Sequence, residues 1–192
     1  MTNKTVFLKW TKNMFYLHCA SLLLTVLGEI PVIGFVFNWI STLVLIVIIV
    51  ALFKLAPANV RYKKAAIFRG ISVGVSFVIY LVPLLGMISI VGSICSFVSL
   101  YQEYCGHAEM LNGIDEKLSR KWHTLFNWNV FGGIVLGILA APLLVVLGVL
   151  LIVDTSVITV LTLILITSFD VILRVIYLIY LKQTRDQIES FR

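Results

Sequence analysis

The chain has 192 residues, of which 60% are hydrophobic and only 12% are charged, and its mean hydropathy is +1.06. A soluble domain of this length has too little polar sequence to cover so much apolar surface, so the composition predicts a multi-pass protein of the lipid bilayer. The net charge of +6 is better explained by basic loops beside a membrane than by nucleic-acid binding. Three cysteines, an odd number, do not suggest a disulfide framework.

The first apolar run, residues 15–53, is too long for one crossing. Its 39 residues would make a helix of about 58 Å, roughly twice the thickness of the hydrocarbon layer. The letters GEIP at residues 28–31 combine a helix-ending glycine, a charge and a proline, which predicts a turn. No small-x-small cleavage site follows the first span, so we expect an uncleaved helix. The expected spans are about residues 12–28 and 32–53.

The second run, residues 70–100, has Pro83 and Gly86 in its middle. As one helix it would be about 46 Å long and would need a tilt near ~50°, which exceeds the usual range. A reversal beside Pro83 gives two spans, at about residues 65–82 and 84–104, with Arg69 reaching back towards the interface.

The basic residues support this reversal. With turns at residues 28–31, 82–86 and near Asp154, every lysine lies on one side of the membrane, and only Glu29 and Asp154 lie on the other. The positive-inside rule then places both termini in the cytoplasm and the protein in the cell (inner or plasma) membrane. The lysines are Lys4, Lys9, Lys12, Lys54, Lys63, Lys64, Lys117, Lys121 and Lys182.

The last spans are expected at about residues 122–152, kinked at Pro142, and 156–182. The whole chain is then a single transmembrane domain, 1–192, with an all-α fold of six transmembrane helices in three helical hairpins. The spacings from Lys12 to Pro31, from Lys63 to Pro83 and from Lys121 to Pro142 are similar. They suggest three copies of one hairpin, although prolines are also simply frequent in membrane helices.

The final span carries a polar stripe at three- and four-residue steps, which places its members on one helical face. Asp170 and Arg174 are correctly spaced for an ion pair along the helix. The stripe is either a site for a small solute or ion, or a self-neutralising lock between helices. Its members are Thr155, Thr159, Thr162, Asp170, Arg174 and Tyr177.

Small residues form ridges on other spans. Gly70 and Gly74, with Ser72 and Ser76, lie on the third span, and Gly133, Gly137 and Ala141 lie on the fifth. Such ridges allow helices to approach closely, and packing is their expected role, with pore lining as the alternative.

The segment from about residue 101 to 121 is predicted to be a cytoplasmic amphipathic elbow. Asn112 and Gly113 should end its first helix, and Asp115 should cap the next. The face that carries Tyr101, Tyr104 and Leu111, together with Trp122 at the interface, is a candidate surface for docking a partner. The pairs Glu103–His107 and Cys105–Glu109, with His123, give only a weak metal signal, and we predict no metal site.

The sequence contains no nucleophile elbow, zinc-protease motif or phosphate-binding loop, so we expect neither an enzyme nor a cofactor. Two functions stay open. The protein moves a small solute or ion, alone as a homo-oligomer or as the membrane subunit of a transporter. Alternatively, it is a non-catalytic assembly subunit that docks a protein partner through its cytoplasmic face.

Overall fold

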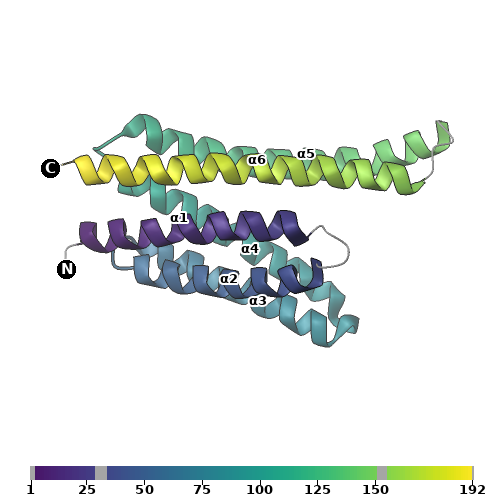
Figure 1. Cartoon of the computed structure of the whole chain (residues 1–192), viewed down its shortest axis with the longest axis horizontal. Coiled ribbons are helices and arrows are strands. Elements are labelled where there is room, and N and C mark those ends of the chain that lie inside the picture. Colours follow the sequence, from purple (N-terminus) through teal and green to yellow (C-terminus); the bar gives the residue numbers. More distant parts are fainter. Residues whose placement is uncertain (1–2, 29–33, 151–154, 192) are drawn as a thin grey trace. The chain divides into compact units, whose positions relative to one another are not determined.

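The computed structural model describes residues 3–28, 34–150 and 155–191, and the side chains of all of these except residues 3, 83–85 and 136–163. Within these ranges the protein is all-helical and contains no strand. The elements are α1 (Asn3–Gly28), α2 (Gly34–Leu55), α3 (Val60–Leu81), the 3₁₀ helix η1 (Pro83–Ile88), α4 (Ser89–Met110), α5 (Glu116–Leu150) and α6 (Thr155–Ser190) (Figure 1). The predicted turns at residues 29–31 and at Asp154 lie outside the described residues.

Three helices in the described part of the chain are long and apolar enough to cross a membrane. They are α2, α3 and the segment Ile164–Ser190 of α6. This supports a helical membrane protein, whereas the six-span bundle remains a prediction. Several helices also extend beyond the expected spans: α1 begins at Asn3 and α6 continues to Ser190.

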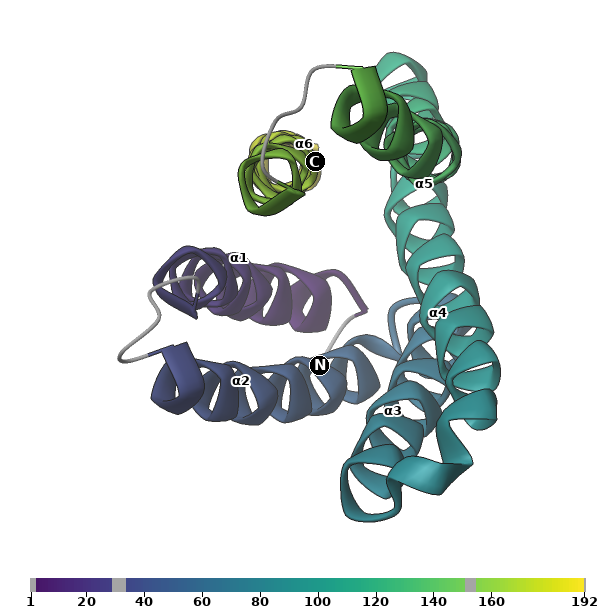
Figure 2. The same cartoon turned by 90° about the vertical axis from the view of Figure 1, so that its right-hand side faces the viewer.

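The helices form two compact units. Unit 1 contains residues 1–123 and 178–192, and unit 2 contains residues 124–177. In unit 1, α1 packs beside α2 and α3 packs beside α4 (Figure 2). The prediction that the whole chain is one transmembrane domain stays a prediction.

The chain reverses beside Pro83, as the sequence predicts. Proline lacks the N–H that would continue the helix, and α3 ends at Leu81, before six residues of 3₁₀ helix lead into α4. The two helices run antiparallel: Tyr62 near the start of α3 shares a hydrogen bond with His107 near the end of α4, and Val75 further along α3 lies against Gly92 near the start of α4. The fourth α-helix begins at Ser89, because the residues before it, Pro83–Ile88, form η1, and the expected span at about residues 84–104 stays a prediction.

The elbow also has the predicted ends. Helix α4 stops at Met110, and Gly113 takes a positive φ of 76° that glycine adopts without steric cost. Asp115 caps α5, because its Oδ1 accepts a hydrogen bond from the Leu118 amide at 2.9 Å.

Unit 1 has a densely packed end and an open end. The packed end, which we call the basic end, carries the connections at residues 56–59 and 111–115, and there Lys4 donates to the Phe191 carbonyl near the C-terminus. Its core consists of side chains with no exposed surface: Phe7, Met14, Leu52, Leu55, Tyr62, Leu111, Trp122 and Leu181. Towards the opposite end, large apolar side chains such as Leu81 and Ile90 are exposed, as expected of surfaces that face lipid.

Candidate functional site: a buried charge cluster below a cleft

The predicted ion pair on α6 forms within unit 2. Arg174 Nε lies 2.7 Å from Asp170 Oδ2, and the two side chains are 38% and 44% exposed. Tyr177, one turn further along, is buried. The side chains of Thr155, Thr159 and Thr162 lie outside the described residues. The pair satisfies its own charges along one helix, as the i,i+4 spacing predicts, and the role of the stripe as a solute site remains a prediction.

The elbow face is covered by the protein's own chain, which corrects the predicted docking surface. Tyr104, Leu111 and Trp122 are buried, and only Tyr101, 39% exposed, is accessible. Trp122 has no exposed surface, and its Nε1 donates to Thr184 Oγ1 at 2.9 Å. An indole can be buried in this way because its one polar group has found a partner.

A buried carboxylate next to the elbow residues joins three helices. Glu103 on α4 has a 1% exposed side chain, and its Oε2 lies 2.8 Å from Nη2 of Arg69 on α3. Its Oε1 lies 3.6 Å from Nε2 of His18 on α1. Arg69 is itself only 14% exposed. Because a buried carboxylate is stable only when it is paired, these contacts fix the relative positions of α1, α3 and α4.

Sequence reasoning missed this cluster. The sequence pattern places Glu103 next to His107, four residues along the same helix, and predicts that Arg69 reaches back towards the interface. A signal was nevertheless present. If the chain reverses about residue 84, Arg69, 15 positions before that point, faces residue 99, 15 positions after it, and Glu103 lies one helical turn further along α4, within reach of the long Arg69 side chain.

His107 lies in an aromatic layer next to the cluster. Its Nδ1 and the Tyr62 hydroxyl share a hydrogen bond of 2.9 Å, and its ring stacks on Trp122 with centroids 4.6 Å apart. Burial lowers the pKa of His107 to about 4, and the Glu103 carboxylate only partly offsets this effect. His107 is therefore neutral near pH 7 and serves as a packed core residue.

Glu109, the other candidate ligand of the elbow, is held at the surface of α4. Partial burial would raise its pKa, but hydrogen bonds from Asn59 and Arg61 outweigh that effect and lower the pKa of the carboxyl. Within the described ranges, no group of three metal-ligating side chains occurs.

Beyond Arg69 towards the open end, a cleft of about 1000 Å³ separates α2 from α3. At the far end of the cleft, the rings of Trp39 and Tyr80 meet edge to face with centroids 5.8 Å apart. Its remaining lining residues are Phe35, Asn38, Thr42, Leu43, Leu45, Ile46, Ile49, Gly70, Ser72, Val73, Gly74, Ser76, Phe77 and Ser96.

The cleft corrects the packing role predicted for the third span. A side chain on Gly70 or Gly74 would meet nothing within 4 Å, so no helix packs on this ridge in unit 1. Close packing occurs instead in unit 2, at Gly132, where an added methyl group would lie 2.0 Å from the ring of Phe169. The predicted member of that ridge, Gly133, faces open space, and the side-chain positions of Gly137 and Ala141 lie outside the described residues.

Comparison with known proteins found no matching family, curated protein or solved structure. The function must therefore be argued from the site itself.

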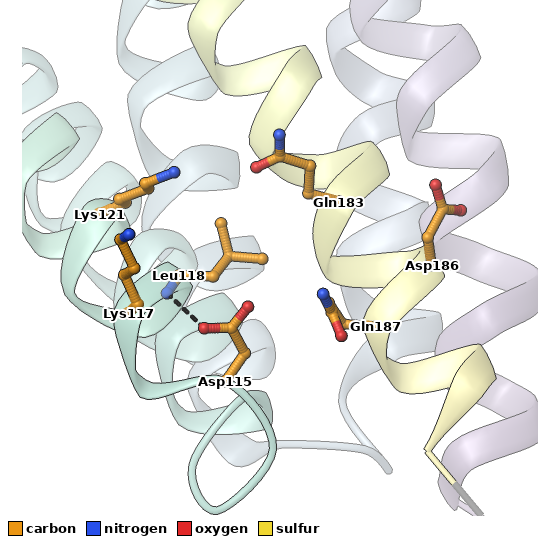
Figure 3. Close-up of a pocket in the computed structure, with 7 residues that line it drawn as sticks. All are labelled: Asp115, Lys117, Leu118, Lys121, Gln183, Asp186 and Gln187. Atoms are coloured by element: carbon orange, nitrogen blue, oxygen red, sulfur yellow. Dashed lines mark hydrogen bonds between the residues drawn. The ribbon is translucent and has the colours of Figure 1, made fainter.

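A second, smaller groove lies at the basic end of unit 1, between the start of α5 and the end of α6 (Figure 3). Its volume is about 330 Å³. Three of its residues come from α6, and the others surround the Asp115 cap. Its lining residues are Asp115, Lys117, Leu118, Lys121, Gln183, Asp186 and Gln187. The groove is polar and of mixed charge, which distinguishes it from the largely apolar cleft between α2 and α3.

Proposed function

We propose that this protein moves a small solute or ion across the cell membrane, alone as an oligomer or as the membrane subunit of a larger transporter, with the cleft between α2 and α3 as the solute path. The proposal includes six membrane spans and cytoplasmic termini. In that orientation the basic end of unit 1 faces the cytoplasm and the cleft opens towards the opposite side.

The observation that carries the proposal is the asymmetry of unit 1. The cleft begins at Arg69, and below it the helices are closed by the Glu103 cluster and by the aromatic layer around Trp122. A path that is open on one side and sealed on the other is the arrangement expected of one state of an alternating-access transporter.

The charges at the base of the cleft strengthen this interpretation. Ionisable side chains within a membrane are costly, and where they occur they mark transport paths more often than lipid-facing surfaces. A purely structural role for Arg69 would require only its pairing with Glu103, whereas Arg69 also lines the cleft. The Asp170–Arg174 pair needs no second helix, so we assign the solute path to the cleft rather than to the stripe on α6.

A second candidate function is assembly. The groove at the basic end presents Asp115, Lys117, Lys121 and Asp186 together, and mixed charges of this kind suit a polar partner surface. In this alternative the protein is a non-catalytic subunit, and its partner binds the groove together with the exposed Tyr101 rather than the buried face of the elbow.

Accessibility from both sides of the membrane tests transport without knowledge of the substrate. In a background without Cys19, Cys95 and Cys105, we would introduce Ser76→Cys, which lines the cleft, and Val78→Cys, which is exposed on the same helix but does not line it. An impermeant maleimide added to intact cells should label the first variant and not the second, because a thiol in lipid does not react.

The deeper variant Ser72→Cys decides between the two functions. A transporter must expose its path to each side in turn, so this thiol should react in intact cells and also, more slowly, in inverted vesicles. If the thiol reacts in only one of the two preparations, its path is exposed to only one side of the membrane, which would contradict transport and favour the assembly role. Asp170→Asn serves as a control outside the cleft and should leave both labelling rates unchanged.

A further inference from the structure

We propose that the cleft between α2 and α3 binds an amphiphile with one anionic head group, which contacts Arg69, and an apolar chain that extends to Trp39. The inference rests on the proposed function and names the class of solute for that path.

The head group follows from the single charge of the cleft. Arg69 is the only ionisable cation among its lining residues, and none of them is acidic. A guanidinium carries five N–H donors in a planar fork, and Glu103 contacts one nitrogen, Nη2, from the buried side. The same side chain therefore has donors for a second acceptor, and the fork matches a carboxylate or a phosphate.

Glu103 also holds the guanidinium in place. The carboxylate is fixed by burial and by His18 at 3.6 Å, so Arg69 is oriented before any ligand arrives. Orientation in advance reduces the entropy lost on binding. The low-dielectric surroundings then strengthen the hydrogen bonds to an anion.

The chain follows from the walls of the cleft. Above Arg69 the lining is mainly aliphatic and aromatic, including Leu43, Ile46 and Phe77. The hydroxyls of Thr42 and Ser76 donate to carbonyls of their own helices, which reduces their demand for water. Arg69 and Tyr80 are eleven residues apart on α3, or about 16 Å, which is room for an extended chain ending at the Trp39–Tyr80 pair.

Other solutes fit less well. A small hydrophilic anion would leave the apolar walls in contact with water, and a neutral chain would leave the remaining N–H donors of Arg69, those not used by Glu103, without an acceptor in the cleft. The required chemistry, an anion on an apolar chain, occurs both in a free carboxylate amphiphile and in an anionic membrane phospholipid, and the experiment separates these two sources.

Fluorescence quenching in nanodiscs of zwitterionic lipid tests both the site and the orientation. The probe is dodecanoate brominated on its terminal carbon, and the signal is the difference between the protein and its Trp39→Phe variant, which removes the contribution of the other tryptophans. We expect strong quenching of Trp39 by this probe and weak quenching by dodecanoate brominated beside the carboxylate. Equal quenching by the two probes would overturn the proposed orientation.

The head-group contact is tested with charge-matched variants. The double variant Arg69→Gln/Glu103→Gln removes both charges together, so no buried charge is left unpaired. It should bind the probe at least about tenfold more weakly, as expected for the loss of hydrogen bonds to a charged group. Terminally brominated dodecanol, which lacks the carboxylate, should likewise bind the unchanged protein at least about tenfold more weakly than the probe does. Binding that ignores both changes would refute the inference.

Competition identifies the source of the amphiphile. If phosphatidylglycerol added to the nanodisc displaces the bromododecanoate, the ligand is an anionic phospholipid; if it does not, the ligand is a free carboxylate amphiphile. Failure is also distinguishable from failure of transport. If Trp39 is not quenched but Ser72→Cys is labelled from both sides, only the amphiphile proposal is overturned. If Trp39 is quenched but Ser72→Cys is labelled from one side, only the transport proposal is overturned.

Discussion

The pair formed by Arg69 and Glu103 gives the sharpest stability prediction. Replacing Arg69 with glutamine leaves a carboxylate whose side chain is only 1% exposed without its cationic partner. Removal of one partner of a buried pair costs about 3–5 kcal/mol, because the remaining charge stays desolvated. Glu103→Gln should cost less, because Arg69 lines the cleft and its charge is better able to reach solvent.

The double variant separates pairing from general damage. With both charges absent, two glutamines can hydrogen-bond to each other, so we expect the double variant to be more stable than Arg69→Gln alone, with a coupling energy of about 2 kcal/mol. The assay is denaturant unfolding in detergent micelles, followed by circular dichroism. Arg185→Gln, which breaks the exposed pair with Glu189, is the matched control and should cost less than about 1 kcal/mol. If the two single costs simply add, Glu103 does not depend on Arg69 and the reasoning fails.

Three further predictions concern His107, the glycines of α5 and the cap of that helix. The pKa of His107 falls from 6.5 to about 4 on folding, so the neutral residue contributes its full stability above pH 6.5. As the pH falls from 6.5 towards 4, the free energy of unfolding should fall by up to about 3 kcal/mol. Melting curves of His107→Leu should lack this pH dependence, and an unchanged dependence would assign it to other groups. Gly132→Ala should destabilise the protein by about 1–3 kcal/mol, because its methyl group would overlap Phe169. Gly133→Ala is the control and should melt no lower than the parent protein. Equal melting temperatures of these two variants would contradict the observed contact. Asp115→Ala should cost about 1 kcal/mol in the same assay and Asp115→Asn much less, and a similar loss in both would show that the cap contributes through charge rather than through its hydrogen bond.

The features that the sequence predicted correctly depend on local chemistry. Pro83 cannot continue a helix, Gly113 adopts a positive φ, and Asp115 follows a turn directly before a helix, so each signal and its structural effect lie within a few residues. The spacing of Asp170 and Arg174 is local in the same sense. These predictions needed no knowledge of which helices are neighbours.

The features that the sequence missed depend on tertiary neighbours. Gly74 and Gly133 belong to the predicted small-residue ridges, yet both face open space, whereas Gly132, outside those ridges, lies against the ring of Phe169. Trp122 has the amphipathic character of an interfacial residue, but its partner Thr184 is 62 positions away. Glu103 lies within the predicted elbow, and only the register of α3 against α4 brings Arg69 next to it.

The account depends most directly on the direction in which unit 1 crosses the membrane. Met87 in η1 is 86% exposed, and Asn112 in the elbow is also exposed, so both positions suit a cysteine label. With an impermeant maleimide added to intact cells in the cysteine-free background, we predict that Met87→Cys reacts and that Asn112→Cys reacts only after the membrane is permeabilised. Labelling of Asn112→Cys in intact cells would place the basic end outside the cytoplasm and contradict the proposed path.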